Sequence, residues 1–203
     1  MKSIEYVHNH NINPLKRIIY LVGCPGQNDE DGGVDFRQAQ SFIKNMDLLE
    51  SKSDDPIVIQ MYSTGGDWFA GMAIFDRIVT SSCKVTMVAH SHATSMSGII
   101  LQAAHERIMM PSAHFMLHYG SDGTSSDYLS VLNYIEYAKT HIGETMFDIY
   151  ANRCVNGEFF KGKTLKQIKS FLKKKLKSGD WYLSPAEAVK YGFIDRVFDG
   201  RKP

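Results

Sequence analysis

Two successive stretches of the chain each combine a buried-looking strand, a short turn and an amphipathic helix, and this repetition constrains the fold more than any other feature. The apolar run at residues 56–62 precedes helical periodicity at 68–80, and the run at 84–89 precedes a second helix at 95–104. Repeated strand–turn–helix units predict an α/β fold with parallel strands. Chemistry in such sheets gathers where strands end and helices begin, so the turns at 63–67 and 90–94 are the first candidates for a site.

The remaining elements follow from the same patterns, and 203 residues suit one domain. Ser184 is a helix cap followed by Pro185, Glu187 lies three residues after the cap, and Gly192 provides the stop. We expect further strands at residues 17–22, 107–110 and 114–118, and further helices at 35–49, 126–154, 165–176 and 184–191.

Composition excludes several classes of protein. The 23 basic and 22 acidic residues nearly cancel, so neither nucleic acid nor a membrane surface is an expected partner. Cys24, Cys83 and Cys154 are scattered and form no CxxC, which disfavours a disulfide framework or a zinc site and favours a reducing compartment. The polar N-terminus has no signal-peptide pattern, and no apolar run approaches the roughly 20 residues of a membrane span. We therefore expect a cytoplasmic protein.

Eight lysines crowd residues 161–177. Leu165, Ile168, Leu172 and Leu176 recur among them at helical spacing. The pattern predicts a solvated amphipathic helix that docks through its leucine and isoleucine stripe. Contact with an acidic partner or nucleic acid is the alternative.

The residues that suit chemistry are ambiguous one at a time. Adjacent Gly65 and Gly66 allow a backbone N–H to face a ligand, but a tight turn needs the same residues. Ser95 opens a helix, where it is a nucleophile in a positive field or simply a cap. His114 and His118 share one face of a strand, and no HExxH motif accompanies them, so no metal is expected.

Taken in order, four motifs resemble those of the Clp proteolytic subunit, a serine peptidase that shares its fold with crotonases. They are YSTGGDWFAGMAIFD at 62–76, ATSM at 93–96, PSAHFMLH at 111–118 and DWYLSPAEAVKYGFID at 180–195. The resemblance extends from about residue 15 to 197. It implies an α/β, ClpP/crotonase-like fold at 15–203, preceded by a short segment at 1–14, with a protruding handle helix in a handle region at about 124–178.

The resemblance also implies roles for individual residues. Ser95 matches the nucleophile, His118 the general base and Asp180 the acid that orients the base, while the backbone N–H groups of Gly66 and Met96 match the oxyanion hole. Hydroxyl attack needs such a base, and the tetrahedral intermediate needs such donors. Substrate would lie extended along Gly65, Asp67, Trp68 and Tyr119, and an apolar pocket near Met96 would favour cleavage after apolar residues. No cofactor is implied.

The implied partners are a peptide or unfolded protein as substrate, further copies of the chain in a homo-oligomeric ring, and a Clp-type ATPase. Three departures from the family bear on these partners: a shorter segment before Leu15, Tyr119-Gly120 where a proline is usual, and a longer stretch between His118 and Asp180. Such differences suit a divergent member, phage-encoded or paralogous. A crotonase-like acyl-CoA enzyme and a catalytically silent ring or scaffold subunit are the alternative functions.

Overall fold

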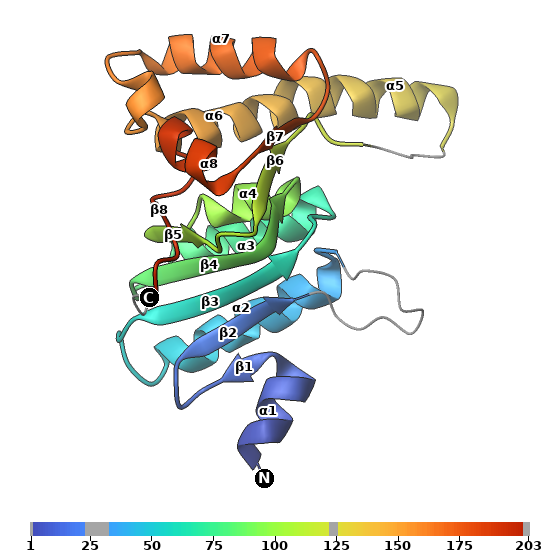
Figure 1. Cartoon of the computed structure of the whole chain (residues 1–203). Coiled ribbons are helices and arrows are strands. Elements are labelled where there is room, and N and C mark those ends of the chain that lie inside the picture. The colour runs from blue at the N-terminus through green and yellow to red at the C-terminus, as the bar shows by residue number, and fades with distance from the viewer. Residues whose placement is uncertain (1, 23–32, 122–125, 201–203) are drawn as a thin grey trace.

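The computed structural model describes residues 2–22, 33–121 and 126–200, and within them one mixed sheet organises the chain (Figure 1). The main path of the sheet runs β1-β2-β3-β4-β5-β8, while β6 pairs with β4 and β7 pairs with β6. Pairing is parallel except for β1–β2 and β6–β7. The strands are β1 (Ile12–Asn13), β2 (Ile18–Val22), β3 (Ile57–Ser63), β4 (Val85–Thr94), β5 (Glu106–Met109), β6 (His114–Leu117), β7 (Trp181–Leu183) and β8 (Arg196–Val197).

Most of the described helices form two groups. In Figure 1, α2, α3 and α4 lie against one face of the sheet, while α5 and α6 form a rod whose α5 end protrudes and α7 packs beside α6. This arrangement confirms the α/β fold with a protruding handle. The helices are α1 (Lys2–His10), α2 (Phe36–Glu50), α3 (Trp68–Val79), α4 (Met96–Leu101), α5 (Tyr128–Tyr137), α6 (Gly143–Cys154), α7 (Leu165–Leu176) and α8 (Pro185–Tyr191).

The turn predicted at residues 90–94 is wrong, because β4 continues through it to Thr94. The first half of β4 pairs with β5, and residues 92–94 then pair with β6. Ser91 lies between the two halves with a positive φ of 55°. One strand with two successive partners thus carries the chain to Ser95.

The helix predicted at residues 126–154 is interrupted by a π-helical turn, Ala138–Ile142, between α5 and α6. Such turns often occur at functional sites. The predicted docking of the lysine-rich helix α7 is confirmed for Ile168, Leu172 and Leu176, which are buried, whereas Leu165 is 44% exposed. The start and stop predicted for α8 are confirmed by a capping box at Ser184 and a left-handed Gly192.

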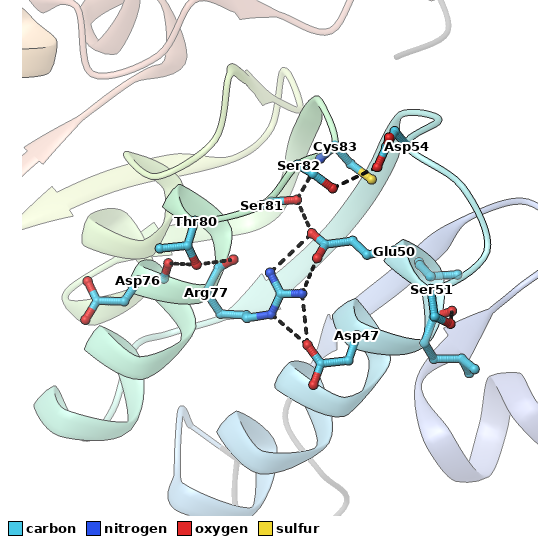
Figure 2. Close-up of polar contacts among 12 residues, drawn as sticks. Asp47, Glu50, Ser51, Asp54, Asp76, Arg77, Thr80, Ser81, Ser82 and Cys83 are labelled. Carbon is cyan, nitrogen blue, oxygen red and sulfur yellow. Dashed lines mark hydrogen bonds and ion pairs between the residues drawn. The ribbon is translucent and has the colours of Figure 1, made fainter.

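An ion-pair network joins α2 to α3 (Figure 2). Arg77 of α3 donates from Nη2 to Oε2 of Glu50 at 2.5 Å and from Nε to Oδ1 of Asp47 at 3.0 Å, and the Ser81 hydroxyl also donates to Glu50. Burial opposes ionisation of Glu50, but these donors outweigh it and lower its pKa. The network fixes the far end of α3, whose first turn follows the Gly65-Gly66 pair.

The N-terminal helix α1 and strand β1 are elements that the sequence patterns do not predict. Ile12 of β1 is 1% exposed, and the Asn45 side chain of α2 donates to the carbonyl of His10 at the end of α1. Cys24 lies outside the described residues. In the part of the chain that the structure describes, none of the helices has the length and apolar character needed to cross a bilayer.

Candidate active site

Ser95 sits in a strained turn between β4 and α4. Its backbone has φ 54° and ψ −130°, a combination rarely adopted by residues other than glycine. Such a conformation costs about 1–3 kcal/mol and persists only where neighbours hold it. Here the Ser95 N–H donates to the carbonyl of Met116 at 3.0 Å, and its carbonyl accepts from the N–H of Gly98 at 3.1 Å.

The loop of Gly65 and Gly66 packs directly against this turn. Both residues have positive φ, 118° and 145°, and neither has room for a side chain. A Cβ on Gly65 would lie 2.6 Å from Cβ of Ser95, and a Cβ on Gly66 would lie 2.3 Å from the carbonyl oxygen of Val34. Val34 donates to the carbonyl of Gly65 and accepts from the N–H of Asp67. The glycine pair is therefore required for close backbone approach on two sides.

Two hydroxyls tie the glycine loop to the Ser95 turn. Thr94 donates from Oγ1 to the carbonyl of Thr64 at 2.7 Å. The Ser97 hydroxyl lies 2.7 Å from the carbonyl oxygens of both Ser63 and Thr94. These contacts hold the ends of β3 and β4 in a fixed relation, so the glycine backbone and Ser95 keep their spacing.

His118 lies between Ser95 and Asp180. Its Nε2 is 2.7 Å from Oγ of Ser95, and its Nδ1 is 3.7 Å from Oδ1 of Asp180. The second distance is longer than a hydrogen bond. The antiparallel register pairs Leu117 with Trp181, which brings the residues after β6 and before β7 side by side. The three side chains that the sequence assigned to catalysis are thus adjacent in space.

A cavity of about 580 Å³ opens beside Ser95 and His118. Gly66, Asp67, Trp68, Met96 and Tyr119, all candidates from the sequence, also line it, while Gly65 and Asp180 do not. The Asp67 carboxylate accepts from the N–H of Ala70 and so caps α3. Asp67 therefore stabilises the start of α3 as well as lining the cavity.

The π-helical turn and its flanking helices supply a wall of the cavity that the sequence patterns do not predict. Its lining residues include Tyr134, Ala138, Ile142, Met146 and Tyr150. They are scattered apolar and aromatic positions in what resembles an ordinary helix, so no local signal marks them. Tyr150 is fully buried, and burial raises its pKa well above the usual value, which keeps the phenol neutral.

Within residues 2–22, 33–121 and 126–200, no group of three or more His, Cys, Asp or Glu side chains is placed to bind a metal ion. His90 contacts Gln60, with Nε2 2.6 Å from Oε1, and does not line the cavity. Neither does His92, which contacts His114 instead.

The chain is similar to known proteins over most of its length. A family model described as Clp protease matches residues 31–201. The ATP-dependent Clp protease proteolytic subunit of Deinococcus radiodurans is 30% identical over 189 residues, covering 91% of this chain and 82% of that protein. The ATP-dependent Clp protease proteolytic subunit 2 of Pseudomonas aeruginosa is 29% identical over 168 residues, covering 82% of this chain and 77% of that protein.

Proposed function

Because the chain belongs to the Clp protease family, we propose that it is a serine endopeptidase that cleaves peptide bonds through an acyl-enzyme. The observation that carries the proposal is the 2.7 Å contact between Oγ of Ser95 and Nε2 of His118 at the wall of the cavity. A base at this distance is positioned to take the hydroxyl proton as the oxygen attacks a carbonyl carbon.

In the proposed mechanism, Nε2 of His118 accepts the Ser95 proton while Oγ adds to the scissile carbonyl. His118 then passes that proton to the leaving amine, and an ester to Ser95 remains. Water then attacks the ester carbonyl carbon while His118 removes a proton from the water. His118 returns that proton to Oγ of Ser95 as the ester bond breaks, and the acid product leaves. Asp180 stabilises the imidazolium and keeps a proton on Nδ1 of His118, so that Nε2 is the nitrogen that accepts the Ser95 proton.

The negative oxygen of the tetrahedral intermediate needs preorganised donors. We assign the backbone N–H groups of Gly66 and Met96 to this task, because both residues line the cavity beside Ser95. Loss of one such donor typically costs about 100- to 1,000-fold in rate. The strained turn and the crowded Gly65 support the assignment, since both restrict how the backbone around Ser95 and Met96 can move.

The substrate we propose is an extended peptide with an apolar side chain before the scissile bond. Met96, Ile99, Ile142 and Met146 give the cavity an apolar wall suited to that side chain. The backbone at residues 65–68 would pair with the peptide by strand addition, and Tyr119 also lines the cavity.

We also propose that the chain assembles into a homo-oligomeric ring with the sites inside. Helix α5 buries none of its residues, and a stable helix needs an apolar face to be covered. Its large exposed apolar side chains are Tyr128, Leu129, Leu132, Ile135 and Tyr137. The relatives are named as ATP-dependent, so a Clp-type ATPase is the proposed partner that delivers substrate. Free thiols at Cys83 and Cys154 suit a cytoplasmic location.

A fluorophosphonate probe tests the chemistry. The parent protein should be labelled and should hydrolyse a fluorogenic peptide with an apolar residue before the cleaved bond, whereas Ser95→Ala should do neither. Ser112→Ala, which alters an exposed serine outside the cavity, is the matched control and should keep both activities. Equal labelling of parent and Ser95→Ala would contradict the proposal.

Two further measurements separate the alternatives. A silent scaffold would form rings in sedimentation but would not be labelled. An acyl-CoA enzyme would turn over an acyl-CoA thioester and leave the peptide intact. Sedimentation of Leu132→Glu tests the role of α5, since a charge on an oligomer contact should shift the parent assembly toward smaller species.

A further inference from the structure

Two histidines on neighbouring strands face each other outside the cavity. His92 of β4 and His114 of β6 are direct register partners. Nδ1 of His92 lies 3.2 Å from Nε2 of His114, and the ring planes meet at 85° with centroids 4.7 Å apart. Both rings are partly exposed, and neither residue lines the cavity of the proposed active site.

The spacing of these nitrogens matches that of two ligands on one metal ion. Zinc–imidazole bonds of about 2.0–2.1 Å at a tetrahedral angle place their nitrogens roughly 3.3 Å apart. The observed 3.2 Å between Nδ1 of His92 and Nε2 of His114 is therefore close to the nitrogen–nitrogen distance that a shared ion requires. Because the two residues are partners in a strand ladder, their Cα positions are set by the sheet before any ion arrives.

The surroundings favour a particular class of ion. The rings of Tyr62 and Tyr182, 49% and 59% exposed, flank the pair with ring centroids 5.9 Å from His92 and 6.1 Å from His114. No described carboxylate completes a three-residue cluster, so the donors are neutral imidazoles with water in the remaining positions. Such donors select zinc, nickel or copper over magnesium or calcium.

The protonation of the pair suits metal binding. Each ring would bind an ion through a nitrogen that carries no proton. The proton now shared between the two nitrogens would move through solvent to the other nitrogen of the donor ring. A small rotation of each ring then turns both lone pairs toward one ion.

We propose that His92 and His114 form a two-imidazole binding site for a divalent late first-row transition-metal ion, completed by water. The ion links β4 to β6, three residues before Ser95 and four before His118. It stabilises the pairing of the two strands that carry the nucleophile and the base. It has no part in the bond-breaking step.

Titration calorimetry of the chelator-treated full chain with zinc, nickel and copper chloride tests the site. We expect one ion per chain, with affinity at least about tenfold weaker in both His92→Gln and His114→Gln, because one imidazole is left. Glutamine keeps a hydrogen-bonding side chain at each position, and circular dichroism checks that both variants fold. His141→Gln, which changes an exposed histidine in the π-helical turn, should bind as the parent does.

One spectroscopic and one thermal measurement locate the ion. Electron paramagnetic resonance of the copper-loaded protein should show two coordinating nitrogens, and zinc should raise the melting temperature of the parent but not of either glutamine variant. Unchanged affinity in His92→Gln or His114→Gln would overturn the proposal. So would binding that disappears in His118→Gln while persisting in His92→Gln, since the ion would then lie at the proposed active site.

Discussion

Gly65 and Ser95 approach so closely that a side chain on the first would overlap the second: a Cβ on Gly65 would lie 2.6 Å from Cβ of Ser95. The same Cβ would lie 3.0 Å from the backbone nitrogen of Met96, which is a proposed oxyanion donor. Gly65→Ala should therefore displace the nucleophile turn. A displacement near 1 Å costs roughly 100-fold in rate, so we expect at least about that loss in peptide hydrolysis and in fluorophosphonate labelling.

Gly162→Ala is the matched control for this substitution. Gly162 also has positive φ, 78°, but a Cβ there would meet no heavy atom within 4 Å. The control imposes backbone strain without a clash at the site, so its activity should match that of the parent. Parent-like rates in folded Gly65→Ala would show that the close approach does not position Ser95.

The fold was predictable where one periodicity dominated a long segment. Residues 56–62 form one apolar run, residues 68–80 repeat at helical spacing, and β3 and α3 match these two segments closely. The second half of β4 was not predictable, because His90, Ser91 and His92 are polar and resemble a turn. They are strand residues because β6 supplies a new partner at that point, and a partner distant in sequence leaves no local periodicity.

The candidate site was predictable only as a set of matching motifs. Ser95 alone resembles a helix cap, and it adopts a strained conformation that no local propensity favours. Asp180 precedes β7, a three-residue strand too short for a period to show, whose pairing with β6 places Asp180 beside His118. The π-helical turn that completes the cavity depends on packing and leaves no sequence signal.

Asp180 should contribute to catalysis less than a buried, directly hydrogen-bonded partner would. Its carboxylate lies 3.7 Å from Nδ1 of His118, and its side chain is 48% exposed, so solvent screens the pair. We expect Asp180→Asn to lower kcat by about 10- to 1,000-fold, below the roughly 10,000-fold typical of a buried triad acid. Steady-state peptide hydrolysis measures this, with Asp127→Asn, the cap of α5, as control. A kcat equal to that of the parent would remove Asp180 from the mechanism.

The network of Arg77, Glu50 and Asp47 should stabilise the fold that presents the glycine loop (Figure 2). The side chains of Arg77 and Glu50 are only 15% and 18% exposed. Replacing either residue would therefore leave a largely buried charge without its partner. Because hydrogen bonds to charged groups are worth about 1.5–3 kcal/mol, Arg77→Gln should lower the free energy of unfolding by roughly that amount. Urea denaturation measures the change.

A double-mutant cycle with Glu50→Gln isolates the contact between the two side chains. If they interact as the structure indicates, the double variant should lose less stability than the sum of the single losses. Additive losses would mean that the two residues act separately. Asp76→Asn, on the exposed face of α3, serves as a control with little expected effect.

The pair of Arg107 and Asp195 should make stability depend on acidity. Burial opposes ionisation of Asp195, but Arg107, which donates to it from its backbone N–H, Nε and Nη2, outweighs that effect and lowers the pKa. A carboxyl with a lowered folded pKa contributes fully above its unfolded pKa of about 3.9 and loses that contribution as pH falls through the folded value. The parent should therefore exceed Asp195→Asn in stability at pH 7, with the gap narrowing below about pH 4. Urea denaturation from pH 7 to pH 3 measures the gap, and a gap that widened toward low pH would mean that the folded pKa is raised.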